Sequence, residues 1–454
     1  MSSERTDFLI VGAGLAGTLM AILLAQRGHS VRLIERRPDP RTAAIERGRS
    51  INLALAARGL HALALAGLEE RVQPLLLPMK GRMLHDPSGA QSFIAYGQRP
   101  HEVIYSVSRG LLNELLLDAA SATRNVRMRF QCTAQSVDFE QARLTLRNAH
   151  KQLSQHAFKS LIGADGAGSP IRAALVGVTG AACDIDMLSH GYKELTIAAR
   201  PDGSHAIERH ALHIWPRGGF MLIALPNLDG SFTVTLFLAK DGPQSFAELT
   251  TSQAVRTFFN AQFRDASELM PDLETEFFEH PMGEMGTVRN TRWALDDRCV
   301  LIGDAAHAIL PFHGQGMNCA FEDCGVLLDK LSATQDIAAA FASFERERIP
   351  QANAIAEMAI ENYIEMRDSV RDPTFQLQRA LALELERRFP TRFVPRYSMV
   401  MFHHEIPYAT AYQRGAIQQE ILQALTGKAG SLEQVDYAQA ERLIVERLPE
   451  LKGA

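Results

Sequence analysis

The sequence predicts an α/β protein with three parts: a nucleotide-binding domain, an inserted sheet that is mostly antiparallel, and a helical C-terminal region. Three observations lead to this prediction. A glycine-rich turn joins an apolar strand to a helix near the N-terminus. Two runs, 213–227 and 231–238, are rich in strand-forming residues and are flanked by turn residues. From about residue 330 onward, apolar residues recur at helical spacing.

The composition limits the classes of protein to consider. The chain has 454 residues, 46% of them hydrophobic, which is enough for a large core and for more than one domain of about 100–200 residues. The 47 basic and 52 acidic residues give a net charge of −5 without a basic block, so no nucleic-acid partner is expected. The five cysteines contain no C-x-x-C pair, which predicts neither a disulfide framework nor a zinc site and favours a reducing compartment.

The first element in chain order is the N-terminal run "DFLIVGAGLAGTLMAILLAQRGHSVRLIERR". The stretch from Phe8 to Ala25 is uncharged and near the length of a membrane span, but three glycines interrupt it, so we expect a strand, a turn and a helix instead. In the pattern Gly12-x-Gly14-x-x-Gly17, the glycines permit the turn, the approach of a pyrophosphate and close helix–strand packing. Glu35 follows the second strand, where a carboxylate binds a ribose. These features predict a Rossmann-like dinucleotide site.

Two further motifs continue the nucleotide-binding domain. "LIGADGAGSPIR" (161–172) predicts a strand, the turn Asp165-Gly166 and a helix that begins near Ser169-Pro170. "RCVLIGDAAHAILPFHGQGMN" (298–318) predicts a strand, the pair Gly303-Asp304, a helical piece that Pro311 stops, and a new helix opened by a glycine-rich turn. No catalytic nucleophile and no second GxGxxG are present, so one dinucleotide is expected to bind stably and any other only transiently.

The order GxGxxG, GADG and GDAAH resembles the flavin monooxygenases that hydroxylate aromatic rings with one tight, non-covalent FAD. The resemblance implies that Asp304 contacts the ribityl chain, and that Asp165 serves FAD and a transient NADPH. It implies FAD contacts at Gly12, Gly14, Gly17, Glu35, Arg36, Ala54, Arg109, Asp165, Gly303, Asp304, Met317 and Asn318. It implies a flavin-facing catalytic loop of Pro311, Phe312, His313, Gly314, Gln315 and Gly316. The oxidant would be a flavin C4a-hydroperoxide formed with O2, which explains the missing nucleophile. His307 and His313 are then expected to be structural or positioning residues rather than acid–base catalysts.

Several blocks of the sequence also resemble the kynurenine 3-monooxygenase family. They are "GRSINLALAARG" (48–59), "GRMLHD" (81–86), "GYKEL" (191–195), "HIWPRGGFMLIALPN" (213–227), "SFTVTLFL" (231–238), "ENYIEMRD" (361–368) and "TRFVPRYSMV" (391–400). The implied reaction is hydroxylation of L-kynurenine at its 3-position to 3-hydroxykynurenine. The implied substrate-binding residues are Arg82, Tyr96, Phe237, Asn362, Met366 and Tyr397, of which Arg82 would bind the carboxylate as a two-donor fork. Alternation along a strand places Thr233, Thr235 and Phe237 on one face, and plain core burial of that face stays an open alternative.

The domain boundaries follow from the same reading. The FAD-binding domain is expected to comprise 1–78, 101–180 and 291–365, the substrate sheet 79–100 and 181–290, and the helical domain 366–454. Pro373, Pro390, Pro395 and Pro407 are expected to divide that last region into short helices. Eukaryotic members of the family carry a hydrophobic membrane tail, whereas this sequence ends "RLIVERLPELKGA", so the resemblance implies a cytoplasmic, bacterial-type enzyme without a membrane span. A homodimer is possible.

Three alternatives stay open at this point. The chain could be another single-component FAD hydroxylase that acts on a phenolic or aminobenzoic acid; the lack of an obvious base for a ring hydroxyl slightly favours kynurenine. A flavin halogenase is disfavoured because the pattern W-x-W-x-I-P is absent around Trp215 and Trp293. In a different class, it could be a non-catalytic flavin-binding sensor, which would not oxidise NADPH with any aromatic compound.

Overall fold

The structure is a computed structural model that describes residues 6–42, 52–366, 373–427 and 429–451. The chain divides into two compact units. Unit 1 comprises Met1–Leu76, Val107–Leu188 and Met285–Ala356; unit 2 comprises Leu77–Ser106, Ser189–Glu284 and Glu357–Ala454. The predicted six-segment division stays a prediction. Of the sequence blocks above, residues 48–51 and 367–368 lie outside the described residues.

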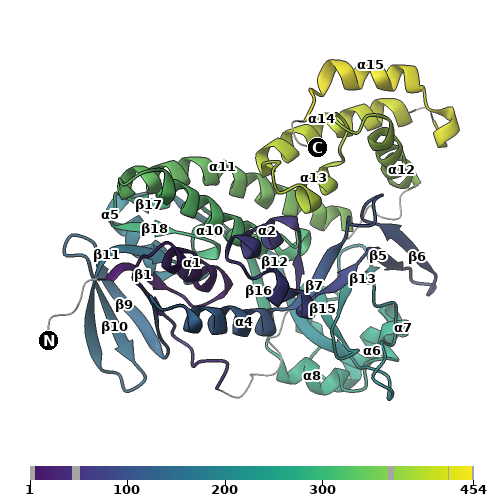
Figure 1. The fold of residues 1–454 in the computed structure, drawn as a ribbon. Helices are drawn as coiled ribbons and strands as arrows, with labels where there is room; N and C mark the ends of the chain where they lie inside the picture. Colours follow the sequence, from purple (N-terminus) through teal and green to yellow (C-terminus); the bar gives the residue numbers. More distant parts are fainter. Residues whose placement is uncertain (1–5, 43–51, 367–372, 428, 452–454) are drawn as a thin grey trace. The chain divides into compact units, whose positions relative to one another are not determined.

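Unit 1 is built on an eight-stranded sheet with the order β17-β18-β11-β1-β2-β8, which β10 and β9 extend from β11 (Figure 1). Its strands are β1 (Thr6–Val11), β2 (Val31–Ile34), β8 (Val126–Arg129), β9 (Cys132–Asp138), β10 (Arg143–Asn148), β11 (Leu153–Gly163), β17 (Ala294–Leu295) and β18 (Cys299–Leu301). β1 pairs in parallel with both β2 and β11, and β18 pairs in parallel with β11. β9 and β10 are antiparallel. The expected parallel nucleotide-binding sheet is therefore present, and β1 is buried on both faces as such a sheet requires.

Helices cover the unit 1 sheet. They are α1 (Leu15–Gln26), α2 (Ala57–Leu65), α3 (Glu69–Val72), α4 (Arg109–Ala122), α5 (Pro170–Thr179), α9 (Asp304–His307) and α10 (Gly316–Ala333), with short 3-10 turns at Gln73–Leu75 and Pro311–His313. The strand β3 (Asn52–Leu55) precedes α2. α1 packs against α4 and α10, and α10 packs against α2. α5 begins at the predicted proline, and the Ser169 hydroxyl caps it by accepting a hydrogen bond from the Arg172 amide. The helical piece after Gly303 ends at His307, before Pro311, so the proline starts a separate turn rather than stopping the helix.

Unit 2 holds most of a seven-stranded sheet with the order β16-β12-β15-β14-β13-β5-β6. Its strands are β5 (Gly81–His85), β6 (Gln91–Ala95), β12 (Cys183–Ile197), β13 (Ala211–Pro216), β14 (Met221–Pro226), β15 (Phe232–Ala239) and β16 (Gly283–Asn290). β4 (Leu77–Met79) and β7 (Ile104–Ser108) pair in a separate three-stranded sheet with the order β3-β7-β4. β12 and β15, β15 and β14, β14 and β13, and β5 and β6 pair in antiparallel fashion, whereas β13 and β5 are parallel. The sequence prediction of a mostly antiparallel inserted sheet is confirmed.

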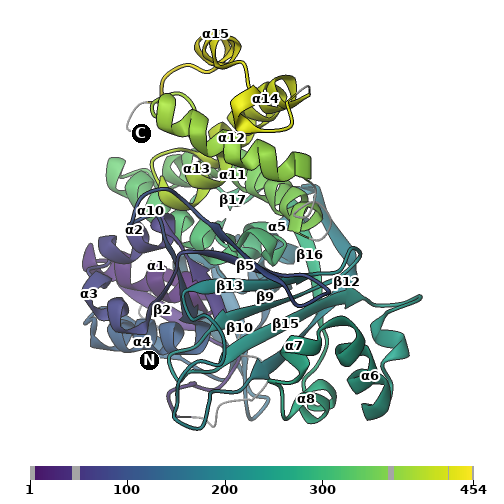
Figure 2. The same ribbon diagram turned by 90° about the vertical axis from the view of Figure 1, so that its right-hand side faces the viewer.

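The two faces of this sheet are different. Strand register places Trp215, Leu222 and Leu236 on one face, where they form a core with aromatic side chains of the covering helices. Those helices are α6 (Ser252–Gln262), α7 (Arg264–Ser267) and α8 (Leu273–Glu279), which lie against the sheet in Figure 2, with a 3-10 turn at Phe246–Glu248 nearby in sequence. The other face carries Arg82 and Phe237, as side-chain alternation along each strand requires.

A chain of buried hydrogen bonds crosses the helix-covered face. The Nδ1 atom of His85 lies 2.7 Å from Asp265 Oδ2, and its Nε2 atom lies 2.8 Å from His213 Nδ1. The Nε2 atom of His213 lies 2.7 Å from the carbonyl oxygen of Glu208. The Trp215 indole also donates to Asp265, 2.9 Å away. Burial lowers the pKa of His213 to about 4, so its ring is neutral at pH 7. The chain anchors β5, the strand that carries Arg82, to α7.

The C-terminal part of unit 2 is helical, as predicted. Its helices are α11 (Ile337–Ile364), which begins in unit 1, α12 (Pro373–Arg388), α13 (Arg396–Phe402), α14 (Tyr408–Thr426) and α15 (Tyr437–Arg447), with a 3-10 turn at Leu432–Gln434. α12 starts at Pro373, and α13 and α14 start directly after Pro395 and Pro407. An apolar core that includes Leu381, Phe393 and Ile444 holds α12, α14 and α15 together.

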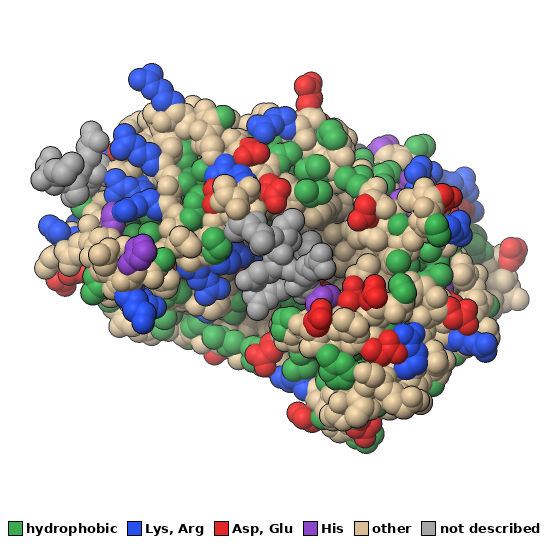
Figure 3. Space-filling view, turned by 90° about the horizontal axis from the view of Figure 1, so that it is seen from below, with side chains coloured by type: hydrophobic (Ala, Val, Ile, Leu, Met, Phe, Trp, Pro, Cys, Tyr) green, Lys and Arg blue, Asp and Glu red, His purple; other side chains and the backbone are tan. Residues whose placement is uncertain are grey.

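The surface and the cysteines agree with the composition. On the face drawn in Figure 3, acidic and basic side chains are interspersed, in keeping with the small net charge. The five cysteines are all free thiols. Within the described ranges, no helix combines the length and the apolar character needed to cross a bilayer.

Candidate cofactor and substrate sites

The glycine-rich turn of unit 1 is shaped by close backbone contacts. Gly12 has φ +106°, and a Cβ atom there would lie 2.2 Å from the carbonyl oxygen of Ala164. A Cβ atom on Gly17 would lie 2.0 Å from the carbonyl oxygen of Gly12. A Cβ atom on Gly14 would meet no protein atom within 4 Å, so the turn is open on that side. These three positions fit a dinucleotide: two glycines let the turn pack, and the third leaves room for a pyrophosphate beside the start of α1.

Glu35 follows β2 and lies beside the turn. One carboxylate oxygen accepts the Ala13 amide at 2.9 Å, and the other accepts both the Arg37 amide at 3.0 Å and the Arg37 guanidinium at 2.9 Å. Burial raises the pKa of this carboxyl, but the hydrogen bonds and the charge of Arg37 outweigh it, so the pKa lies below its ordinary value. Glu35 is therefore an anion that already braces the turn. Arg36 and Arg109, both predicted FAD contacts, are exposed.

The GADG and GDAAH motifs are joined by a residue that the sequence analysis did not select. Buried Arg172 donates to the carbonyl oxygen of Ala305 at 3.0 Å and to that of Ala167 at 2.5 Å. Asp165 accepts the Ser169 hydroxyl at 2.5 Å, and burial raises the pKa of its carboxyl above the ordinary value. Arg172 thus holds the loop after Asp165 against the turn that carries Asp304. Its position in the helix start "SPIR" gave no signal of this role.

The predicted flavin-facing loop is a 3-10 turn followed by α10. Gly314 has φ +65°, a conformation that favours glycine, and α10 begins at Gly316. The Asn318 amide donates to the carbonyl oxygens of Ala54 and Gly314, at 2.8 and 2.9 Å, and its oxygen accepts the Ala56 amide at 2.9 Å. The Asn318 side chain therefore braces the loop from inside. Pro311 is exposed at the surface of unit 1, whereas Phe312, His313, Gln315 and Met317 are buried.

Three of the predicted substrate residues form a cluster in unit 2. The Arg82 guanidinium carbon lies 5.0 Å from the ring centre of Tyr397 and 5.9 Å from that of Tyr96. The two tyrosine rings stack at 5.4 Å with 13° between their planes. Among the described residues, the Nε atom of Arg82 and the hydroxyl of Tyr96 have no hydrogen-bond partner, although both atoms are buried. Buried donors of this kind normally have partners, so the cluster is prepared for a polar ligand.

The charge of this cluster is positive. Arg82 is 3% exposed and forms a loose ion pair of 3.5 Å with Glu365, the first residue after α11. Arg379 lies close enough that burial and the positive charge of Arg82 lower its pKa. Burial raises the pKa of the Tyr96 and Tyr397 hydroxyls, so both are neutral donors. Two guanidinium groups and one carboxylate leave a net charge of +1, which favours an anion.

The remaining predicted substrate residues are buried in unit 2. Phe237 lies on the Arg82 face of the sheet, with its ring centre 6.4 Å from that of Tyr192. Asn362 donates to the Met366 sulfur at 3.3 Å, one turn further along the chain. Thr233, Thr235 and Phe237 share a face, as predicted from alternation. Sequence reasoning missed Glu365 and Arg379, and a lone charged residue in a helical stretch offers no signal that could have selected either.

The FAD binding domain family matches residues 5–359. The chain is 49% identical over 447 residues to the kynurenine 3-monooxygenase of Stenotrophomonas maltophilia (strain K279a), covering 98% of each chain. It is 48% identical over 450 residues to that of Myxococcus xanthus (strain DK1622), covering 99% of this chain and 97% of the relative.

Similar solved structures share the fold. One is the tetrameric form of 2-methyl-3-hydroxypyridine-5-carboxylic acid oxygenase, with a TM-score of 0.66 at 19% identity over 82% of this chain and 95% of that one. Another is Pseudomonas aeruginosa PqsL in complex with 2-aminobenzoylacetate, with a TM-score of 0.64 at 19% identity over 80% of this chain and 97% of that one. At these identities the likeness concerns the fold alone, and it agrees with the predicted fold class.

Proposed function

Because the chain belongs to the FAD binding domain family and, within it, to the kynurenine 3-monooxygenases, we propose that it hydroxylates L-kynurenine at the ring 3-position. The product is 3-hydroxykynurenine, and the co-substrates are NADPH and O2. Bound FAD supplies the redox chemistry, namely electron transfer from NADPH and activation of O2, so the protein needs no nucleophile of its own. The protein's residues bind, orient and shield the reactants.

The observation that carries this proposal is the Arg82–Tyr96–Tyr397 cluster. L-Kynurenine has a carboxylate, and the cluster has a buried guanidinium with an unused Nε–H, an unused tyrosine hydroxyl and a net positive charge. A guanidinium binds a carboxylate through two parallel hydrogen bonds, which fix orientation as well as charge. The stacked tyrosine rings hold the guanidinium plane in place by cation–π contact. Phe237 on the same sheet face offers an apolar surface for the substrate ring.

The unit 1 residues hold the cofactor in this proposal. The turn from Gly12 to Gly17 binds the pyrophosphate, with Gly14 on the open side. Glu35 binds the adenosine ribose with the lone pairs that Ala13 and Arg37 leave free. Exposed Asp304 binds the ribityl chain, and the 311–316 loop borders the flavin ring and keeps water from it.

The test is an assay of the purified protein with FAD. NADPH oxidation is measured with L-kynurenine, anthranilate, salicylate and 4-hydroxybenzoate, and products are identified by mass spectrometry. We expect oxidation coupled to 3-hydroxykynurenine with kynurenine alone. Turnover and hydroxylation of a phenolic or aminobenzoic acid instead would support a different hydroxylase. No turnover with any of the four would support a flavin-binding sensor.

A further inference from the structure

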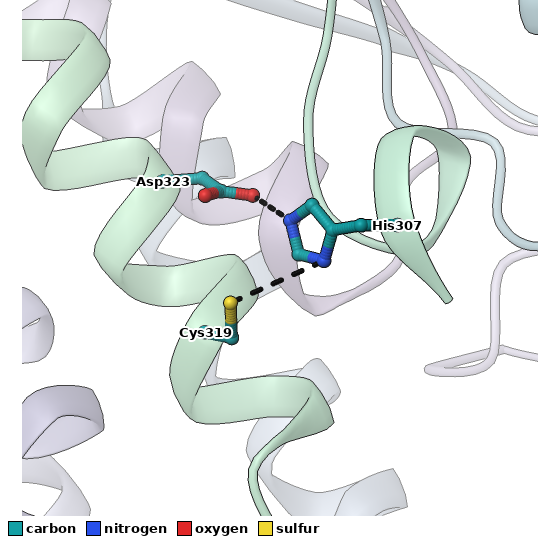
Figure 4. A group of neighbouring side chains, drawn as sticks. All are labelled: His307, Cys319 and Asp323. Atoms are coloured by element: carbon teal, nitrogen blue, oxygen red, sulfur yellow. Dashed lines mark hydrogen bonds and ion pairs between the residues drawn. The ribbon is translucent and has the colours of Figure 1, made fainter. Parts of the chain in front are cut away.

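One buried carboxylate, that of Asp323 on α10, accepts hydrogen bonds from three groups. Its Oδ2 atom lies 2.9 Å from the Gly303 amide nitrogen and 2.6 Å from His307 Nε2, and its Oδ1 atom lies 2.7 Å from Arg348 Nε. Asp323 is fully buried, and Figure 4 shows it pointing from α10 toward the His307 ring. Burial raises the pKa of this carboxyl, but the charges of His307 and Arg348 outweigh it, so the pKa stays below its ordinary value and the group is an anion.

The two groups on Oδ2 are the two ends of α9. Gly303 precedes this four-residue helix and His307 ends it, so a single oxygen atom holds both ends. A single helical turn is unstable by itself, because nucleation fixes several residues for one hydrogen bond. Gly303 also has φ +58° and ψ −145°, a backbone conformation that residues other than glycine rarely adopt. The shape of α9 therefore depends on Asp323.

Of the four residues in α9, only Asp304 is exposed, whereas the other three are buried. The Asp323 anchor therefore determines where the Asp304 carboxylate points. The anchor is itself held by an ion-pair network. Arg348 donates to Glu322 at 2.5 Å, and Arg58 donates to the other oxygen of Glu322 at 2.5 Å. Two guanidinium groups and the His307 ring, whose pKa is raised by Asp323 despite burial, thus contact two carboxylates, so each of these charges has an opposite charge beside it.

A metal site is the other use that this cluster could have. The ligand atoms of His307, Cys319 and Asp323 lie within 4.8 Å of one another. However, the positively charged Arg348 side chain bonds Asp323 and also lies 3.3 Å from the Cys319 sulfur, where it would repel a cation. His307 and Asp323 are also joined directly at 2.6 Å. The cluster is complete as a hydrogen-bond network.

We propose that Asp323, through α9, is a positioning residue for FAD, with His307 as its partner. It holds Asp304 in the direction in which the cofactor's ribityl hydroxyls are bound. This inference rests on the proposed function, in that unit 1 must bind FAD. The sequence predicts that His307 is a structural or positioning residue rather than an acid–base catalyst, and in this proposal Asp323 is its partner.

The test measures FAD binding to the apoprotein by flavin fluorescence, independently of turnover. We expect Asp323→Asn to raise the FAD Kd at least about ten-fold, because it removes one of the two counter-charges of Arg348 and weakens both anchors. His307→Leu should raise it about ten-fold, whereas His307→Gln, which keeps an N–H near the Nε2 position, should stay within about three-fold of the wild type. The matched control is Asp329→Asn, an exposed aspartate on the same helix, which should leave the Kd unchanged.

Two further measurements separate positioning from general damage. Kd values are taken only at temperatures where circular dichroism shows each apoprotein folded. In an Asp304→Asn background, Asp323→Asn should weaken FAD binding by less than about three-fold, since its effect passes through Asp304. Wild-type affinity in folded Asp323→Asn and His307→Leu would overturn the inference, as would a zinc-dependent rise in unfolding temperature that Cys319→Ser removes. Failure of the wild-type apoprotein to bind FAD would instead overturn the proposed function.

Discussion

The candidate cofactor site of unit 1 and the candidate substrate site of unit 2 are built in opposite ways. The first is made of backbone: Gly12 and Gly17 leave no room for a Cβ atom, and Asp323 and Arg172 hold the turns by their amides and carbonyls. The second is made of side chains: Arg82, Tyr96 and Tyr397 come from a strand, a loop and a helix that are far apart in the sequence. A backbone site tolerates no added volume where its turns pack, as at Gly12 and Gly17, whereas a side-chain site depends on charge and ring contacts. The two should therefore fail for different reasons.

The largest expected effect concerns the glycines. Gly17→Ala places a Cβ atom 2.0 Å from the Gly12 carbonyl oxygen, so α1 must shift. We expect the apoprotein to lose about 3 kcal/mol of stability and FAD affinity to fall at least 100-fold. Gly14→Ala has no protein atom within 4 Å, so it should leave apoprotein stability unchanged and weaken FAD about ten-fold. Denaturant unfolding and FAD titration of both variants check this. If both substitutions destabilised the apoprotein equally, the proposed difference would be contradicted, namely that Gly17 is needed for packing of α1 and Gly14 for the approach of the pyrophosphate.

The next effect concerns Arg82. Arg82→Ala removes the partner of a desolvated carboxylate, a loss of about 2–5 kcal/mol, so the apparent KM for kynurenine should rise about 30-fold or more. FAD content should stay normal, because Arg82 belongs to the substrate site. Arg82→Lys should recover little, since an ammonium cannot reproduce the two-donor fork. Steady-state kinetics and flavin absorbance measure both. A decarboxylated kynurenine analogue should bind wild type and variant alike; an equal loss for that analogue would show that Arg82 acts only structurally.

Acid should affect the two units at different pH values. The folded pKa of His213 is about 4, below the ordinary value of 6.5, so the unfolded chain binds more protons between these values. Stability from this group is present above pH 6.5 and is lost as pH falls toward 4, about 2 kcal/mol by pH 5. Glu35 and Asp323 in unit 1 have lowered pKa values, so their contributions persist until pH falls below about 4.5. Thermal unfolding from pH 7.5 to 5 tests this, and His213→Gln should flatten the profile. If the unfolding temperature of His213→Gln depended on pH as steeply as that of the wild type, the loss of stability could not be assigned to His213.

The smallest effect concerns Glu35. Glu35→Ala should weaken FAD binding by about 1–3 kcal/mol, since it removes a ribose acceptor and leaves the Ala13 amide without its partner. Glu35→Gln retains one acceptor and should fall between the alanine variant and the wild type. Fluorescence titration of the apoproteins gives the values. A wild-type Kd for Glu35→Ala would count against the ribose role and leave Glu35 as a brace of the turn.

The same contrast explains what the sequence could predict. The glycine turn and the helix start at Ser169 are local, because backbone sterics leave their mark on adjacent residues, and both were found. The region that holds Pro373, Pro395 and Pro407 is divided into short helices as expected, and each of these prolines lies at a helix start, which was not predicted. Pro350 instead lies inside α11, because a helix of 28 residues keeps most of its hydrogen bonds without one donor. Such an exception depends on packing that local patterns do not contain.

The residues that hold the sites in place were not predictable in this way. Asp323 lies in "FEDCGVLLDKL", where an aspartate on a helix is ordinarily solvated, and only the folded chain brings Gly303, His307 and Arg348 to it. Arg82 and Tyr397 were selected by family resemblance alone. Their pairing depends on which strand and which helix meet, so no spacing in the sequence could have predicted it.

The buried chain from Asp265 through His85 and His213 to the Glu208 carbonyl has a consequence for the two faces of the sheet. Its three short contacts link α7, β5, β13 and the segment before β13 on the helix-covered face. His85 lies on β5 three residues after Arg82, and side-chain alternation places the two residues on opposite faces. A change on the helix-covered face therefore reaches the substrate face through the backbone of β5, without any side chain crossing the sheet.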